Sequence, residues 1–249
     1  MPSSSTPRLS DAGGNAGGNP GDAVDAAVDH LLDVVKPRLR GWLHAVMFPI
    51  VVLGGIALVA ATPTPRGRIG MSVFVVTAAL LFGTSALYHR GTWTPPVARV
   101  LRRLDHANIF LVIAGTYTAF AATLLDDAAA RTLLWVMWVG AVLGVVFKVA
   151  WVGAPRWVST PLYVLLGWVA VFYVGPFYRS GGALVLALIV AGGVLYTLGA
   201  VVYGLKRPDP SPRWFGFHEV FHTFTILAFL AHFAAAGLAV ATAGPPVGA

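Results

Sequence analysis

Two histidines four residues apart, His218 and His222, are the side chains of this sequence with the clearest potential for metal chemistry. On an α-helix this spacing puts both imidazole rings on one face, where they can hold a single ion. Ser85 and His89 repeat the spacing in an earlier apolar segment, and an acidic residue, Asp105, lies further along. The chain contains no cysteine, which excludes thiolate metal ligands, disulfides and cysteine nucleophiles.

Three histidines suit zinc, because a catalytic zinc site has three protein ligands and leaves a fourth position for water. We therefore predict a zinc site formed by His89, His218 and His222. Asp105 is predicted to accept a hydrogen bond or a proton from the zinc-bound water, whose pKa such a site lowers towards ~7. Ser85 is predicted to orient a carboxylate or a substrate carbonyl.

The elements that must position these residues are membrane spans. Hydrophobic residues make up 57% of the 249 residues, charged residues only 11%, and the mean hydropathy of +0.75 excludes a water-soluble globule. Each of seven apolar segments is long enough, at roughly 18 to 27 residues, to cross a hydrocarbon core of about 30 Å. The sequence predicts an all-α membrane protein with a seven-transmembrane helix bundle, its helices near 42–62, 69–89, 104–125, 132–151, 160–178, 182–204 and 215–241.

Basic residues predict the orientation of this bundle. Twelve Lys and Arg residues fall on the side that carries the N-terminus and four on the other side, so the positive-inside rule predicts a cytoplasmic N-terminus and an outside C-terminus. The net charge of +7 arises between apolar runs, not in a stripe with interleaved aromatic residues, which disfavours nucleic acid as a partner. In this topology His89 ends the second span, Asp105 opens the third, and His218 and His222 open the seventh, all at the cytoplasmic end.

The segments that flank the bundle differ in composition. Residues 1–21 are rich in Ser, Gly, Pro and Asn, with no apolar run, and are predicted to be disordered. Residues 22–40 are predicted to form an amphipathic segment in the headgroup region, the alternative being a disordered acidic linker. Residues 41–242 form the predicted transmembrane domain, and 243–249 a short tail. The sequence leaves the oligomeric state open.

Each polar residue also has a structural interpretation. The paired histidines could bond to the preceding loop, Asp105 could cap the third helix, and Ser85 could be a packing residue. His232 is about 15 Å deeper than His222, which is too far to share its ion, and is interpreted as structural. His106 points about 100° away from Asp105 and is left out of the ligand set, whereas His44 is a second-tier candidate for the same cluster.

Residues 218–222 also match the H-E-x-x-H pattern, in which two histidines bind zinc and the glutamate is the general base of a metalloprotease. An intramembrane protease with Glu219 as its base is therefore an alternative. The segment has no further Asp or Glu that could be a third ligand, whereas His89 and Asp105 supply a third ligand and a base from other helices. These considerations make the protease the minor alternative.

Three segments together resemble the hemolysin III family: Ser85–His89, Leu104–Thr118 and Phe217–His222, the last followed by His232. The stretch 36–44 before the first span is similar to the family as well. That family is grouped with the progestin and adipoQ receptors and, more distantly, with alkaline ceramidases. The resemblance implies a seven-helix bundle with a cytoplasmic N-terminus and zinc held by His89, His218 and His222, with Asp105 and Ser85 as neighbours.

Two classes of function remain open after this resemblance. One is a ceramidase-like hydrolase in the plasma membrane, in which Asp105 is the base and the substrate is an amide or ester of a membrane lipid. The other is a non-enzymatic cytolysin or receptor-like membrane protein whose zinc is structural. The near absence of charge from the outer two thirds of the helices disfavours a constitutive aqueous channel.

Overall fold

A computed structural model describes residues 37–151 and 153–242 of the chain. The predicted disordered residues 1–21, the tail 243–249 and most of the amphipathic segment 22–40 lie outside the described residues. Throughout the described ranges the regular secondary structure is helical, as the apolar segments predicted. The helices are α2 (Trp42–Ala61), α3 (Pro65–Arg90), α4 (Pro95–Leu124), α5 (Asp127–Ala150), α6 (Arg156–Gly167), the 3₁₀ helix η1 (Trp168–Tyr173), α7 (Val174–Leu205) and α8 (Phe217–Thr242).

Helices α3, α4 and α5 begin earlier than their apolar segments because polar caps and prolines extend them. Thr64 caps α3 by accepting a hydrogen bond from Gly67 N, and Pro65 occupies the first turn, where its missing N–H costs nothing. Pro95 and Pro96 likewise occupy the first turn of α4. Asp126 caps α5, and its hydrogen bonds from the backbone of Ala129 and Ala128 hold the pKa of its carboxyl below the usual value.

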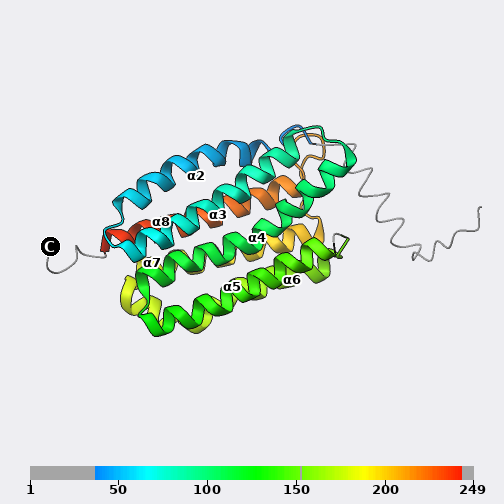
Figure 1. Cartoon of the computed structure of the whole chain (residues 1–249). Coiled ribbons are helices and arrows are strands. Elements are labelled where there is room, and N and C mark those ends of the chain that lie inside the picture. Colours follow the sequence, from blue (N-terminus) through cyan, green and yellow to red (C-terminus); the bar gives the residue numbers. More distant parts are fainter. Residues whose placement is uncertain (1–36, 152, 243–249) are drawn as a thin grey trace, which may run out of the picture. The chain divides into compact units, whose positions relative to one another are not determined.

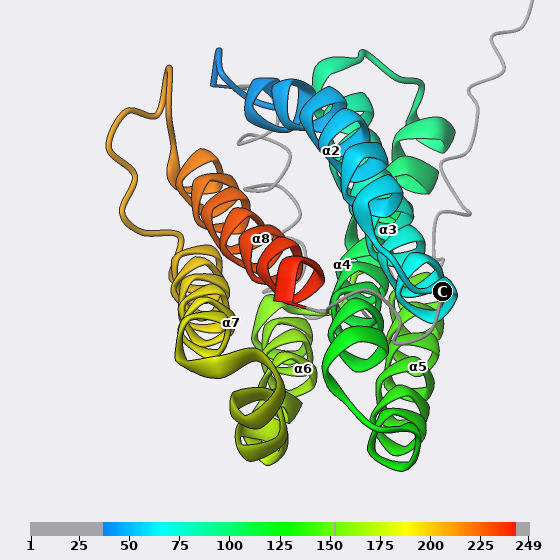
Figure 2. The ribbon, with the colours of Figure 1, turned by 90° about the vertical axis from the view of Figure 1, so that its left-hand side faces the viewer.

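Six helical stretches of the described chain are long and apolar enough to cross a membrane, and one of them, Arg156–Leu205, has 50 residues. A straight helix of that length would measure about 75 Å, more than twice the hydrocarbon thickness. Its helical geometry breaks at Gly182, whose φ is 75°, and α6 and η1 pack back against α7 (Figures 1 and 2). This stretch therefore contains both the fifth and the sixth of the predicted spans.

Helix α4 is the centre of the bundle. Its most apolar 18-residue window is 67% buried, against 28% for α2 and for α5. It packs mainly between α3 and α5 and also contacts α6, α7 and α8, while α7 and α8 form a closely packed pair (Figure 2). The core around it is dominated by large aromatic side chains that are fully buried, among them Phe74, Phe82, Phe110, Phe177 and Phe229.

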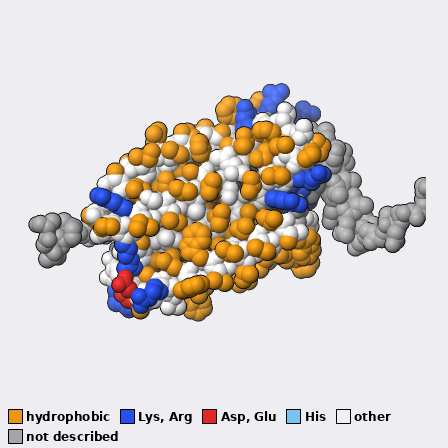
Figure 3. Space-filling model, in the orientation of Figure 1, with side chains coloured by type: hydrophobic (Ala, Val, Ile, Leu, Met, Phe, Trp, Pro, Cys, Tyr) orange, Lys and Arg blue, Asp and Glu red, His pale blue; other side chains and the backbone are white. Residues whose placement is uncertain are grey.

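The outer surface between the helix ends is hydrophobic. In Figure 3 apolar side chains cover the middle of the visible face, and Lys and Arg gather towards the two ends of the helices. Large apolar residues such as Leu53, Trp135 and Phe172 are exposed there, where in water they would form a costly patch. The chain is a multi-pass integral membrane protein.

Tyr117 of α4 explains why the helix that begins with α6 changes to 3₁₀ geometry at Trp168. Its hydroxyl donates a hydrogen bond to the carbonyl of Gly167 and accepts one from Ala170 N. The hydroxyl thus bridges two backbone groups three residues apart, where the α-helix passes into the 3₁₀ helix, and a side chain inserted among backbone hydrogen bonds is a known cause of helix distortion. A side chain of the central helix therefore shapes the wall that α6 and η1 present to the bundle.

We expect Tyr117→Phe to destabilise the protein, because it leaves a backbone carbonyl and an N–H without their partner in apolar surroundings. The loss should be about 1–3 kcal/mol, measured by denaturant unfolding in detergent micelles. Tyr178→Phe is the matched control, since Tyr178 is an exposed tyrosine. Equal stability of the two variants would contradict this account of the distortion.

Candidate metal centre

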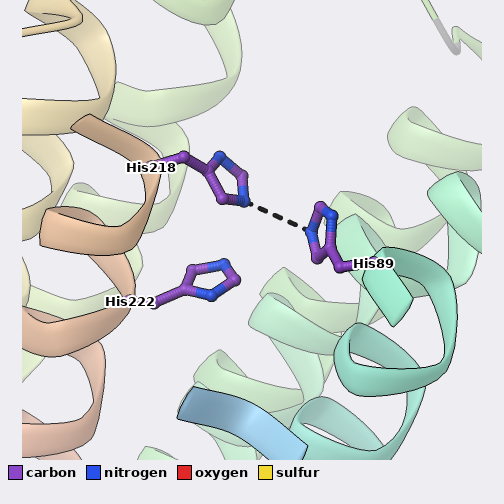
Figure 4. A group of neighbouring side chains, drawn as sticks. All are labelled: His89, His218 and His222. Carbon is purple, nitrogen blue, oxygen red and sulfur yellow. Dashed lines mark hydrogen bonds between the residues drawn. The ribbon is translucent and has the colours of Figure 1, made fainter. Parts of the chain in front are cut away.

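His89, His218 and His222 converge at one end of the bundle. Each offers a ring nitrogen, and the three nitrogens lie within 4.8 Å of one another. In Figure 4 the rings of His218 and His222 point from α8 towards the ring of His89 on α3. His89 and His222 are buried, and His218 is partly buried. The cluster thus joins residues that are 129 positions apart in the chain.

The spacing of one pair of these nitrogens is that of two ligands of a common zinc ion. His89 Nε2 and His218 Nε2 are 3.2 Å apart. Two nitrogens bound to one tetrahedral zinc at 2.0–2.1 Å are separated by roughly 3.3 Å, so this pair already has the separation of two ligands of one ion. The chemistry fits as well, because imidazole nitrogens are common zinc ligands. Three histidines close together could therefore bind a metal ion.

Local sequence explains why the ligands occur at helix ends. His89 lies in the last turn of α3, which ends at Arg90. Helix α8 begins at Phe217, whose N–H donates to Asp209 Oδ1, so His218 and His222 occupy its first two turns on one face. The predicted placement of these three histidines at the ends of their helices is confirmed.

Asp105 and Ser85 lie beside the histidines. Asp105 Oδ2 is 3.8 Å from His89 Nε2, and Ser85 and Asp105 line the same cavity beside the histidines. The prediction that Asp105 opens the third helix is wrong, because α4 begins at Pro95 and Asp105 is three turns inside it. Asp105 therefore is not an N-terminal cap. An ionisable side chain inside a membrane span is costly, and the neighbouring His89 gives this carboxylate a reason to be there.

His44 of α2 is the second-tier candidate that the structure brings into the cluster. Its ring stacks on that of His222, with a centroid distance of 3.8 Å and an interplanar angle of 6°. A nitrogen lone pair lies in the plane of its ring, so two parallel stacked rings cannot both direct a lone pair at one ion. His44 therefore supports the ring of His222 and does not share a metal with it in this arrangement.

The other two intramembrane histidines bond to backbone and aromatic groups. His106 Nδ1 lies 2.7 Å from the carbonyl of Arg102, and its Nε2 lies 3.4 Å from the Tyr203 hydroxyl. His232 Nε2 donates to the carbonyl of Ile189, 43 positions away. His232 thus bonds to α7, at a different depth from the candidate ligands, as its spacing predicted.

A single cavity connects the histidine cluster with the interior of the bundle. Its polar end is lined by His44, Ser85, Asp105, His218 and His222, and its deeper part mainly by apolar side chains from α4, α6, η1 and α7. Trp168, Val171 and Val190 line it as well and are exposed on the outer surface. Beside η1 and α7, side chains of the cavity wall therefore also form part of the outer surface of the bundle.

Comparison with known proteins places this arrangement in a family. The model of the haemolysin-III-related family matches residues 32–233, most of the chain. The chain belongs to the haemolysin-III-related family. This confirms the resemblance carried by the three sequence segments, and it agrees with a multi-pass protein of the plasma membrane.

Two relatives of this haemolysin-III-related protein come from bacilli. It is 34% identical over 163 residues to "Hemolysin-3" of Bacillus cereus, and the matched stretch covers 66% of this chain and 71% of the relative. It is 32% identical over 158 residues to "Hemolysin-3 homolog" of Bacillus subtilis (strain 168), and the matched stretch covers 64% of this chain and 71% of that relative.

Sequence reasoning missed two contributions to the site. The apolar cavity wall from α6, η1 and α7 has no periodicity that separates it from lipid-facing residues, so no sequence signal marks it. Arg40 contributed only to the count of basic residues, although its side chain reaches the buried carboxylate of Glu219 beside the first α8 ligand. The available signal was Glu219, an acidic residue between two candidate ligands in an apolar span. A buried carboxylate needs a cationic partner, so its presence indicates that a basic residue lies nearby.

We expect the purified protein to bind zinc with a stoichiometry of one, and both His89→Ala and His218→Ala to lose it, because two remaining imidazoles cannot complete the site. Metal analysis of protein in detergent measures this directly. His232→Ala is the control, since His232 is a buried histidine on the same helix but about 15 Å away, and it should keep the metal. Full zinc retention in both site variants would refute the site.

Proposed function

We propose that this protein is a zinc-dependent membrane hydrolase that cleaves an amide or ester bond of a membrane lipid. The observation that carries the proposal is a three-histidine cluster with an adjacent carboxylate, of which His218, His222 and Asp105 line the polar end of a largely apolar cavity. The polar end of the cavity can bind water and the headgroup with its reactive bond, while the apolar part can bind an acyl chain. A water-soluble substrate would have no use for that apolar part.

The position of the cavity wall favours a lipid substrate over a water-soluble one. Side chains of the cavity wall, including Trp168 and Val190, are also exposed on the outer surface, which faces lipid in a membrane. A chain already dissolved in the bilayer could enter sideways without crossing water. The reactive bond would then reach the histidine cluster while the chain remains in apolar surroundings.

The chemistry assigns separate roles to the polar residues. When bound by His89, His218 and His222, zinc would supply Lewis acidity that polarises the scissile carbonyl and acidifies water. The Asp105 carboxylate takes the proton as the water oxygen adds to the carbonyl carbon, and returns it to the leaving nitrogen or oxygen as that bond breaks. Ser85 lines the cavity beside Asp105 and orients its carboxylate, so its role is to position the base.

The end of the bundle that carries this site is inferred to face the cytoplasm. Basic residues are concentrated around it, in the segment before α2, between α3 and α4, and between α7 and α8. Fewer basic residues, among them Arg66, Arg131 and Arg179, lie at the other end. The substrate's reactive bond would accordingly lie at the level of the inner leaflet.

The contacts of Glu219 favour this hydrolase over an H-E-x-x-H protease. One carboxylate oxygen bonds to Arg40 Nε and the other accepts from Gly216 N. With both oxygens engaged, Glu219 is poorly placed to take a proton from water at the metal. Asp105, which faces the cluster from another helix, is the better base.

Cytolysis is the second candidate function, because the two relatives are named for haemolysis. The cavity of this chain is mostly apolar along its length, unlike the polar lining of an aqueous pore. Membrane damage could then follow from lipid hydrolysis without a pore. The two explanations differ in whether leakage depends on the metal ligands.

We expect Asp105→Asn to retain zinc but to lose at least 100-fold of lipid hydrolysis, since the amide keeps the shape of the side chain and cannot take a proton. Turnover of N-acyl and ester lipids by detergent-purified protein measures the loss. Asp127→Asn is the control, because it removes an exposed carboxylate at the opposite end of the bundle. Undiminished turnover in the Asp105 variant would require another base.

We expect dye leakage from vesicles that contain the protein to require a hydrolysable lipid and intact metal ligands. Vesicles made of ether lipids, which lack acyl ester and amide bonds, should therefore remain sealed. Leakage that is equal for wild-type protein and His218→Ala, in both kinds of vesicle, would support a pore and count against the hydrolase.

A further inference from the structure

Helices α3 and α8 carry the candidate ligands but are not each other's main packing partners. α8 packs chiefly on α7, and α3 chiefly on α4 and α2. Long side chains bridge the gap, with Phe74 and Phe82 of α3 contacting Phe229 of α8 in the core. The histidines themselves lie in terminal turns, the part of a helix that opens most easily. Elements that contact the ends of both helices can therefore help to fix their separation.

The segment Pro37–Gly41, here called the strap, lies at this end of the bundle and precedes α2. Its backbone binds the loop that leads into α8: Arg38 N donates to the carbonyl of Arg213, and Leu39 N to that of Trp214. The Arg38 guanidinium also lies 4.5 Å from the ring centroid of Trp214, a cation–π distance. The strap therefore anchors the chain immediately before the first α8 ligand.

Arg40 of the strap reaches α8 itself. Its Nε donates to Glu219 Oε1, and the other oxygen of Glu219 accepts from Gly216 N at 2.9 Å. The Glu219 side chain is 1% exposed and directly follows His218 in the chain. A carboxylate buried this deeply is stable only with a partner, and removing one member of such a pair leaves an uncompensated charge.

The other end of the strap touches α3. Gly41 has a φ of 80°, and a Cβ built on it would lie 2.8 Å from the Cβ of His89. Only glycine permits both this backbone conformation and this approach to the ligand residue. Beside it the Arg90 guanidinium lies 3.9 Å from the ring centroid of Trp42, which ties the end of α3 to the start of α2.

We propose that the strap sets the separation of His89 from His218 and His222, and that Arg40, Gly41 and Glu219 are positioning residues of the metal centre. The proposal rests on the metal binding of the proposed function and is independent of the hydrolysis. It gives the glutamate of the H-E-x-x-H pattern a role in holding α8 to the strap. It also makes the segment before the first span part of the site.

Metal affinity of the full-length protein in detergent tests this proposal, with zinc measured by chelator competition and cobalt by its visible absorption. Arg40→Gln and Glu219→Gln should each weaken metal binding roughly 10- to 100-fold, the usual effect of removing support behind a ligand. The double variant should bind about as well as either single variant, because both substitutions break one interaction. Gly41→Ala should weaken binding by pushing on His89.

Arg66→Gln is the matched control. Arg66 Nη1 lies 2.7 Å from Asp127 Oδ1, so this substitution breaks an ion pair of the same type at the opposite end of the bundle. It should leave metal affinity unchanged. The absorption bands of bound cobalt separate positioning from stability, because displaced ligands change the bands while a merely less stable protein keeps them. Gly41→Ala provides this readout if the Arg40 variant does not fold.

The proposal is overturned if Arg40→Gln, Glu219→Gln and Gly41→Ala bind zinc and cobalt as the wild type does, with the same cobalt bands. It is also overturned if the wild-type protein binds neither metal. If the wild-type protein binds metal and the variants bind it more weakly, but no lipid is hydrolysed at saturating zinc, the strap proposal stands and the hydrolase proposal fails.

Discussion

The cost of keeping polar side chains inside an apolar bundle is the constraint on which this structure depends. Three imidazoles and a carboxylate, all buried or partly buried, lie together at one end of the helices. Such groups are stable when they satisfy each other or hold an ion. The cluster in turn requires the ends of α3 and α8 to stay close together, although each of these helices packs mainly on other neighbours.

The elements around the cluster are arranged to meet that requirement. α4 is at the centre of the bundle and brings Asp105 to the histidines, and α2 supplies the ring that stacks on His222. The same α4 carries Tyr117, whose hydroxyl bridges two backbone groups where α6 passes into η1. One helix therefore positions the carboxylate of the site and shapes the apolar wall of the cavity that extends from it.

Much of the fold followed from local composition. Seven apolar segments predicted the spans, because in a bilayer the backbone must satisfy its own hydrogen bonds and a helix of a given length is required. The helix boundary at Pro95 and Pro96 was harder to predict from the sequence, since proline is found both between helices and in the first turn of a helix. That ambiguity placed Asp105 at a helix start, whereas it is three turns inside α4.

The sequence by itself determined which residues could bind a metal and which helix ends carry them, because i, i+4 spacing and span topology are local properties. Only the tertiary structure decided that His44 stacks on His222, that Glu219 is held by Arg40, and that a largely apolar cavity adjoins the cluster. These contacts join residues from distant parts of the chain. Their geometry depends on how whole helices pack, and spacing along one helix carries no information about that.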